Sequence, residues 1–251
     1  MTTTTTTMRR ATMRTPLGNG VVRRFFSVGV SMGSAKSNVF VVRVPRQRAC
    51  ALLVVMQLTR SLASQDKGVA EMNAGNLNEA IRLFDEALSV EANNVRAQMN
   101  RAVALHSSER RDESDVIFAM LLVSCQHVAR LAGMCYYHLA DSLLYKNEHD
   151  SAIETLKLGI EAMENGEMER GFEAAAAVVR ARLHSTLGLT LLNQKRLVEA
   201  EQAWLAGVAA APAVRDNYVS LARFYVQQQK LLEAKEVRVC VVIIYICFLF
   251  L

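Results

Sequence analysis

The feature that most constrains this chain is a set of small and aromatic residues that recurs at fixed intervals. Steps of 12, 4 and 3 residues separate the members of two sets, which are Gly68, Ala80, Phe84 and Ala87, and Gly188, Ala200, Trp204 and Gly207. A pattern that returns in this way is the signature of a repeat architecture, in which each unit packs on its neighbours. Only 3 Pro and 12 Gly among 251 residues favour helices as the repeating elements. The sequence therefore predicts a helical repeat array.

The segment 76–90 has the periodicity of an amphipathic helix. Its apolar residues return at spacings of three, four and seven, with charged residues between them. Gly75 and Asn76 directly before it predict a turn in which Asn76 caps the helix. A second helix is expected from about 62 to 73, and two helices joined by so short a turn pack antiparallel.

These intervals resemble the signature of tetratricopeptide repeats, in which a small residue, a tight turn, Ala, an aromatic residue and Ala follow one another. The resemblance implies an all-α, right-handed solenoid of about five antiparallel helix pairs over residues 61–238, in which the small residues let backbones approach where helices cross. The signature positions are Gly68, Ala80, Phe84, Ala87, Ala102, Phe118, Ala140, Ala152, Gly188, Ala200, Trp204, Pro212, Ala222 and Ala234.

The third unit departs from this pattern. Ala140 and Gly188 are 48 residues apart, which is 14 more than one repeat of 34. The surplus falls around 164–173, a stretch rich in Glu and Gly, and predicts lengthened helices with an exposed charged loop. Two substitutions accompany it, because Ser114 stands where the family prefers Ala and Leu156 replaces an aromatic residue.

The charge of the chain is divided between two unlike parts. No Asp or Glu precedes Asp66, whereas ten Arg and Lys lie between Arg9 and Arg60. The remainder holds nineteen basic and twenty-four acidic residues, so the net charge of +5 belongs to the N-terminal part.

An Arg-rich, acid-free N-terminus with a Thr tract is typical of a mitochondrial transit peptide. We expect a leader over 1–26 that is cleaved after Phe26, followed by a basic linker and N-terminal helix over 27–60. This helix, centred on the apolar run 49–58, is expected to cover the first repeat unit. The location expected from the leader is the mitochondrial matrix rather than the outer membrane. The alternative is a basic arm that contacts nucleic acid or acidic lipid.

The resemblance also implies what the array binds. Stacked helix pairs present a concave face, formed by the first helix of each unit, to a protein segment. Of the slots that hold the C-terminal carboxylate of chaperones in related proteins, only Asn100 matches, so a chaperone clamp is disfavoured. Candidate groove residues are Asn100, Arg101, His138 and Ser185. The pentatricopeptide family of organellar RNA binders is a competing class, but an acidic array disfavours nucleic acid.

No motif for catalysis is visible, since a phosphate loop, a paired-carboxylate motif and a nucleophile elbow are all missing from the sequence. We therefore expect a non-catalytic adaptor without a cofactor. The set Cys125, His127, Cys135 and His138 has metal-ligand residue types, but positions 125 and 135 are expected on the inner faces of packed helices, which disfavours zinc. The odd count of 5 Cys indicates a reducing compartment.

The last 13 residues, 239–251, carry no charge. As a helix they would span about 20 Å, which is short of the roughly 30 Å hydrocarbon core of a bilayer. Three interpretations stay open: a short membrane tail, a final helix that packs on the array or on a partner, and an incorrect gene end, which we favour.

Overall fold

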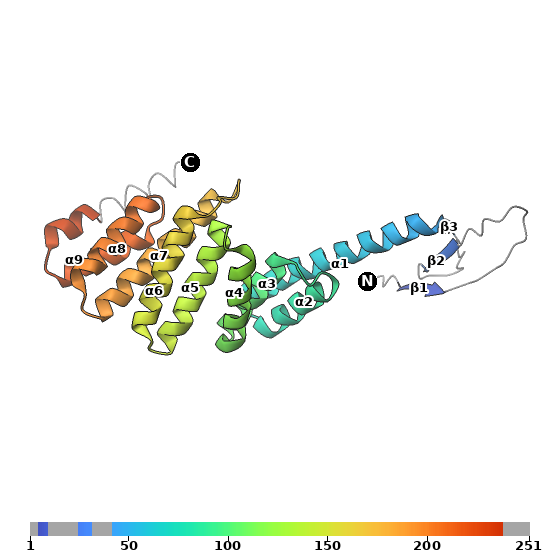
Figure 1. Ribbon diagram of the computed structural model, residues 1–251, viewed down its shortest axis with the longest axis horizontal. Coiled ribbons are helices and arrows are strands. Elements are labelled where there is room, and N and C mark those ends of the chain that lie inside the picture. The colour runs from blue at the N-terminus through green and yellow to red at the C-terminus, as the bar shows by residue number, and fades with distance from the viewer. Residues whose placement is uncertain (1–4, 10–24, 32–41, 238–251) are drawn as a thin grey trace, which may run out of the picture.

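The computed structural model describes residues 5–9, 25–31 and 42–237 (Figure 1). Three short strands come first and form an antiparallel sheet in the order β1-β2-β3: β1 (Thr5–Arg9), β2 (Phe25–Ser31) and β3 (Val42–Pro45). The sequence did not predict these strands, and β2 contains Phe26, where cleavage of the leader is expected. Most of the expected leader and the apolar tail 239–251 lie outside the described residues, so both stay predictions.

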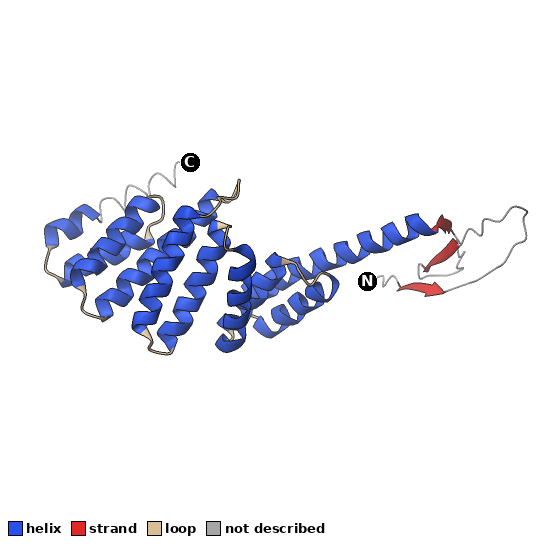
Figure 2. Ribbon diagram, viewed as in Figure 1, coloured by secondary structure: helices blue, strands red, loops and turns tan. Residues whose placement is uncertain are grey.

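The rest of the described chain is helical, as Figure 2 shows. Its helices are α1 (Arg46–Asn73), α2 (Leu77–Val90), α3 (Val95–Ser107), α4 (Arg111–Cys125), α5 (Ala129–Tyr145), α6 (His149–Asn165), α7 (Glu173–Asn193), α8 (Leu197–Ala210) and α9 (Asp216–Gln227). Residues 231–237 are also helical and follow α9 after a short turn. Four helix pairs and the beginning of a fifth are therefore present within the described residues.

The helices pack as antiparallel pairs that stack into an array. The closest packing joins α1 with α2, α3 with α4, α5 with α6, and α7 with α8. The first helices α5, α7 and α9 also contact one another in succession, whereas successive second helices make no comparable contact within the described chain. The array therefore curves toward its first helices, which confirms the predicted all-α solenoid.

The signature residues hold the pairs together. A Cβ at Gly68 would lie 2.7 Å from the ring of Phe84, and a Cβ at Gly188 would lie 2.5 Å from the ring of Trp204. Both aromatic rings are buried, so each glycine makes room for the ring of the second helix. The alanines of the pattern are buried as well: Ala80, Ala87, Ala102, Ala140, Ala152, Ala200, Ala222 and Ala234. Pro212 follows the end of α8, as predicted.

The two departures from the pattern are accommodated in the core. Ser114 is fully buried, and its hydroxyl donates a hydrogen bond of 2.8 Å to the carbonyl of Arg111, so the extra polar group is satisfied within its own helix. Leu156 is also fully buried and packs in the large core cluster of α5 to α9 together with Trp204. Neither substitution disturbs the helix pairs.

The surplus residues lengthen the helices around the third unit, as predicted. α5 and α6 have 17 residues each, and α7 has 21. The loop between α6 and α7 is held against the turn before α5, since the Glu167 amide donates to the His127 carbonyl at 2.7 Å and the Ala129 amide donates to the Glu167 carbonyl at 3.0 Å. Arg130 adds an ion pair to Glu169 at 2.8 Å and lies 4.6 Å from the centre of the Phe172 ring.

The sequence predicted two separate helices, one centred on 49–58 and one from about 62 to 73, and this prediction was wrong. A single helix of 28 residues runs through 46–73, whereas α2 has only 14 residues and faces only the second half of α1. Residues 54–60 are exposed, and burial begins at Ser61. The first half of α1 therefore does not cover the first unit but extends beyond it (Figure 1). The reason is that no helix-breaking residue separates 49–58 from the repeat, so the helix continues straight.

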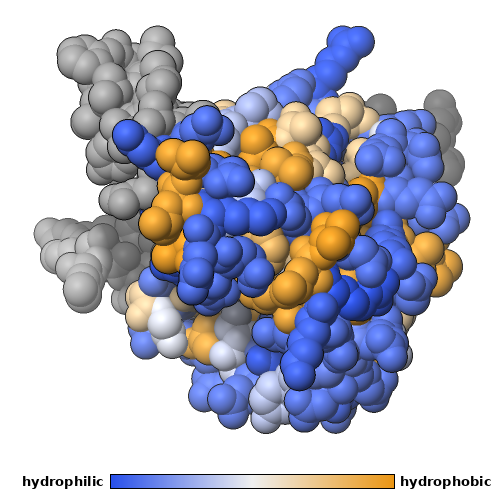
Figure 3. All heavy atoms as spheres, turned by 90° about the vertical axis from the view of Figure 1, so that its left-hand side faces the viewer, coloured by the Kyte–Doolittle hydropathy of each residue, from blue (hydrophilic) through white to orange (hydrophobic). Residues whose placement is uncertain are grey.

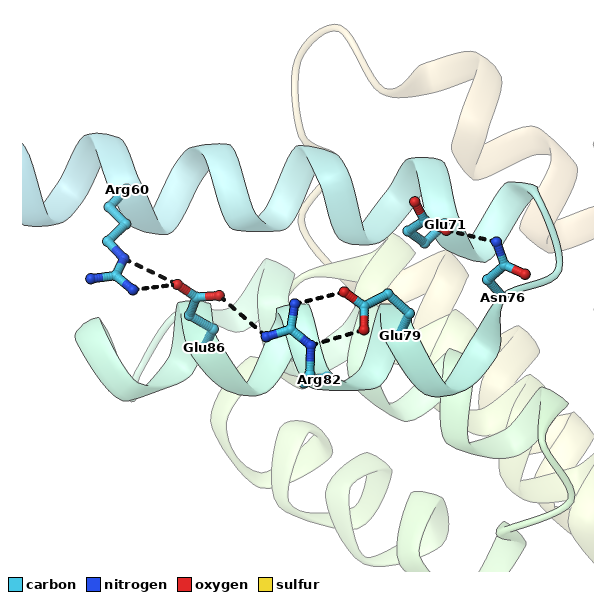
Figure 4. A network of polar contacts seen from close by, with 6 residues as sticks. All are labelled: Arg60, Glu71, Asn76, Glu79, Arg82 and Glu86. Atoms are coloured by element: carbon cyan, nitrogen blue, oxygen red, sulfur yellow. Dashed lines mark hydrogen bonds and ion pairs between the residues drawn. The ribbon is translucent and has the colours of Figure 1, made fainter. Parts of the chain in front are cut away.

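Charged residues join α1 to α2 where this extension meets the array (Figure 4). Arg60 binds Glu86 at 2.7 Å, and Arg82 bridges Glu86 and Glu79 along α2. Asn76 occupies the N-cap position of α2, but its side chain donates to the Glu71 carboxylate at 2.8 Å and makes no cap hydrogen bond. The predicted capping role of Asn76 is therefore wrong.

Candidate protein-interaction surface

A group of polar side chains fills the space between the first helices α3 and α5. This central polar cluster consists of His106, Arg111, His138 and Asp141. Asp141 Oδ2 lies 2.8 Å from both His106 Nε2 and Arg111 Nη1. Arg111 Nη1 also lies 2.8 Å from His106 Nε2. The backbones of α3 and α5 make no extensive contact, so these side chains connect the two helices.

The ionisation of the cluster follows from its contacts. The pKa of Asp141 is lowered by its hydrogen bond to His106 and further by that to Arg111, so the carboxylate is charged. His106 Nε2 can donate to Asp141 when it carries the proton, or accept from Arg111 when the proton is on Nδ1. Nδ1 of His106 is buried and has no hydrogen-bond partner in the described part of the chain.

His138 is held between aromatic rings. It stacks on Phe118 with centroids 4.9 Å apart and an interplanar angle of 2°, and its edge faces His106 at 4.9 Å. Burial, together with the nearby His106, lowers the pKa of His138 to about 4. His138 is therefore neutral at physiological pH, and its buried Nδ1 also has no partner among the described residues.

Two residues beside the cluster are available to a partner. Arg182 of α7 is close enough to influence the pKa of Tyr137 and of His138, yet it has no ion-pair partner in the described chain. Tyr145, at the end of α5, is 67% exposed and is covered on one side by the Arg111 guanidinium, 4.6 Å from its ring centre. An unpaired guanidinium and an exposed aromatic ring, each next to the central polar cluster, suit carboxylates and backbone carbonyls of a bound segment.

The four groove residues predicted from sequence have different surroundings. Asn100 is half-buried on α3, and Arg101 pairs with Asp85 of α2 at 2.5 Å, so its charge is already compensated. His138 belongs to the central polar cluster. Ser185 of α7 lies 3.3 Å from the hydroxyl of Ser220, and its carbonyl accepts a hydrogen bond from Trp204 Nε1. Their role in binding stays a prediction.

Sequence reasoning missed His106, Arg111, Asp141 and Arg182. One signal was present, because His106 and Asp141 are 35 residues apart, as are Ser185 and Ser220, which is close to one repeat. Residues separated by about one repeat on successive first helices meet side by side in a solenoid. Arg111 gave no such signal, since it lies at the start of a second helix.

The metal set considered from sequence does not assemble. Cys125 and Cys135 are free and buried, and burial raises the pKa of the Cys135 thiol to about 12, so that thiol stays protonated. The described residues contain no group of three or more metal-binding side chains. Among the same residues, none of the helices combines the length and the apolar character that crossing a bilayer requires.

Comparisons with known proteins agree with this architecture. Two family models described as tetratricopeptide repeat match residues 66–114 and 135–165. A solved structure titled as the functional characterisation of Pseudomonas aeruginosa pilF is similar with a TM-score of 0.56 at 15% identity, covering 73% of this chain and 76% of that one. The crystal structure of MamA is similar with a TM-score of 0.51 at 18% identity, covering 73% and 97%. A comparison with curated proteins gives no significant match. The helix pairs, the buried signature residues and the two family matches together show that the described array contains tetratricopeptide repeats.

Proposed function

We propose that this protein is a non-catalytic scaffold that binds a segment of another protein along the face formed by α3, α5 and α7. The observation that carries the proposal is the central polar cluster with Arg182 and Tyr145 beside it. Polar groups that are held in place before binding lose little conformational freedom when a partner arrives. Tetratricopeptide repeats are generally protein-interaction scaffolds, and this surface is the part of the array best equipped for that role.

The charges on this face define the kind of segment that it accepts. Asp141 is neutralised by Arg111, whereas Arg182, which lies near His138, has no ion-pair partner among the described residues. A guanidinium in this position favours a segment that offers a carboxylate or two carbonyl oxygens. The described array from 61 to 237 holds eighteen basic and twenty-four acidic residues, which argues against an RNA backbone as the ligand.

The proposed place of action is the mitochondrion, and the proposed role there is that of an assembly or adaptor factor. The acid-free, Arg-rich N-terminus supports import into this organelle. N-terminal sequencing of protein purified from mitochondria is expected to begin at Ser27. Recovery of intact Met1 would contradict the cleavage, and recovery from another compartment would contradict the location.

Affinity capture from purified mitochondria tests the scaffold, with the wild type compared with R182E and with K235E. Each substitution reverses the charge of one exposed side chain, but Lys235 lies in the last described helix, away from the cluster. Wild type and K235E are expected to recover a defined set of proteins that R182E loses, and nuclease treatment is expected to leave the set intact. Equal recovery by R182E would exclude this face, and loss with nuclease would favour the RNA alternative.

A further inference from the structure

Residues 54–60 of α1 are exposed on a part of the helix that no other described element covers. We call residues 46–60 the α1 arm. Every residue from Val54 to Arg60 is exposed, and the change at Ser61 is abrupt, because Ser61 is 1% exposed and its hydroxyl donates to the Ala87 carbonyl. At 1.5 Å per residue the α1 arm is about 22 Å long. It extends away from the array, as Figure 1 shows.

The composition of the α1 arm does not suit a helix surrounded by water. Residues 49–59 are uncharged, and the side chains of Val54, Val55, Met56 and Leu58 are between 43% and 56% exposed. A short helix in water depends on tertiary packing, and a helix that is apolar on all sides is normally buried. Thr59 presents no free donor either, because its hydroxyl donates to the Met56 carbonyl at 3.0 Å. Within the described residues nothing covers 54–60, so this part of the arm offers an apolar surface to a partner.

Charge indicates what that partner is. Arg46 and Arg48 begin the arm, and no acidic residue precedes Asp66 anywhere in the chain. Two parallel copies of the arm would place Arg46 and Arg48 of both copies together, with no carboxylate among residues 46–60 to compensate them, which disfavours such a pairing with a second copy of this chain. A surface that is negatively charged outside and apolar inside complements both features of the arm. The surface of a bilayer with anionic lipids has this character.

We propose that the α1 arm anchors the protein to a membrane that contains anionic lipid, with the uncharged middle of the arm embedded at the bilayer surface and Arg46 and Arg48 at the headgroups. Helices of this kind lie in the interface and need not span the bilayer. The array, which is acidic from residue 61 onward, is repelled by the same surface. The arm therefore holds the array beside the membrane and leaves the face of α3, α5 and α7 free, independently of the partner bound there.

Figure 3 shows why exposed apolar residues alone would be weak evidence, since such residues are also scattered among polar ones at the opposite end of the array. The second helix α4 provides a matched control. Val116 and Met120 are 61% and 65% exposed, which is more than Val55 and Leu58. The arginines at the start of α4, Arg110 and Arg111, are paired with Glu113 and Asp141, so their charge is compensated. If any exposed apolar side chain bound lipid, the exposed residues of α4 and those of the α1 arm would bind it equally.

Flotation of the full chain with phosphatidylcholine vesicles, with and without phosphatidylserine, tests the proposal. The wild type is expected to float with the anionic vesicles and to bind the neutral ones at least about tenfold more weakly. V55D/L58D is expected to reduce binding to anionic vesicles about tenfold or more, since two buried side chains are lost from the interface. R46Q/R48Q is expected to reduce it about tenfold on anionic vesicles only. V116D/M120D is expected to bind as the wild type does.

Several results would overturn the proposal. If the wild type bound neither kind of vesicle, the arm would belong to a protein interface. If V55D/L58D bound as tightly as the wild type, the binding would come from the basic residues before the arm. If V116D/M120D lost as much binding as V55D/L58D, the interaction would be a general one of exposed apolar surface. The outcome of the affinity capture with R182E does not depend on these vesicle experiments. The proposal of a partner-binding face and the proposal of a membrane anchor can therefore fail independently.

Discussion

At the scale of single residues, the array depends on places where a glycine of one helix meets an aromatic ring of the next. Gly188 and Trp204 are the tightest example, since the missing side chain of the glycine is replaced by the indole ring. The ring is also oriented, because its Nε1 donates to the Ser185 carbonyl one turn before Gly188. Shape and a hydrogen bond thus fix the crossing of α7 and α8 together.

G188A is expected to lower the free energy of unfolding by about 1–3 kcal/mol, because the added methyl group overlaps the Trp204 ring. Chemical denaturation of the wild type and the variant measures the effect. In a W204F background the same substitution should be less harmful, since the smaller ring leaves room. An equal loss in both backgrounds would show that Trp204 is not the cause.

His138 makes stability depend on pH. Burial lowers its pKa to about 4 from 6.5, and the charged groups that face it are His106, Asp141, Arg111 and Arg182. Between these two pH values the unfolded chain binds a proton at this position that the native chain does not, so acidification favours unfolding. The free energy of unfolding is not reduced by His138 above pH 6.5. It decreases as the pH falls toward 4, by about 3 kcal/mol in all.

Unfolding free energies of the wild type and H138N at pH 7.5 and pH 4.5 test this expectation. H138N is expected to lose less stability between the two values, because Asn cannot take up the proton. The comparison uses the difference between pH values, so a constant destabilisation by the substitution does not affect it. An identical loss in both proteins would mean that other groups account for the decline.

At the scale of helices, the two asparagines at the starts of α2 and α3 perform different tasks. Asn94 accepts a hydrogen bond of 3.0 Å from the Ala97 amide and so caps α3, whereas Asn76 binds Glu71 instead. N94A is expected to lower the unfolding free energy by about 1 kcal/mol, and N76A by less. Thermal unfolding of both variants measures this ranking. The reverse order would show that the contact between Asn76 and Glu71 matters more than the cap.

The helices also show where sequence reasoning succeeds. Small residues such as Gly68 and Ala80 have steric roles that any member of the repeat family must satisfy, so their spacing predicted the pairs. The continuity of α1 follows from the lack of a helix-breaking residue after 49–58, but the exposure of residues 54–60 was not predictable in this way, because it depends on which elements pack against them. Asn76 illustrates the same limit, since a residue type suited to capping has a second partner within reach.

The candidate site was predictable only in part, for a related reason. His138 was selected from its place on a first helix, and the structure places it in the central polar cluster. Arg101 was selected on the same ground, but Asp85 of the preceding unit engages it. Whether a polar residue is free or compensated depends on a neighbour about one helix away. That relation between units is visible only in three dimensions.

At the scale of the whole molecule, α1 is one helix in two environments. Amides of residues 54–60 are expected to exchange hydrogen at least about tenfold faster than those of 62–73, since only the latter pack on α2. Exchange measured by mass spectrometry on overlapping peptides resolves the two parts. Uniform protection along α1 in the isolated protein would mean that the arm is covered within the molecule itself.

The bridge between the residues before α5 and the loop after α6 has a mechanical consequence. The third pair has its turn at 146–148 and is fastened again at its far end by the hydrogen bonds between 127–129 and Glu167. Its two helices are thus connected at both ends. The third pair, which carries His138 and Asp141, is therefore held at both ends and is expected to move as one unit.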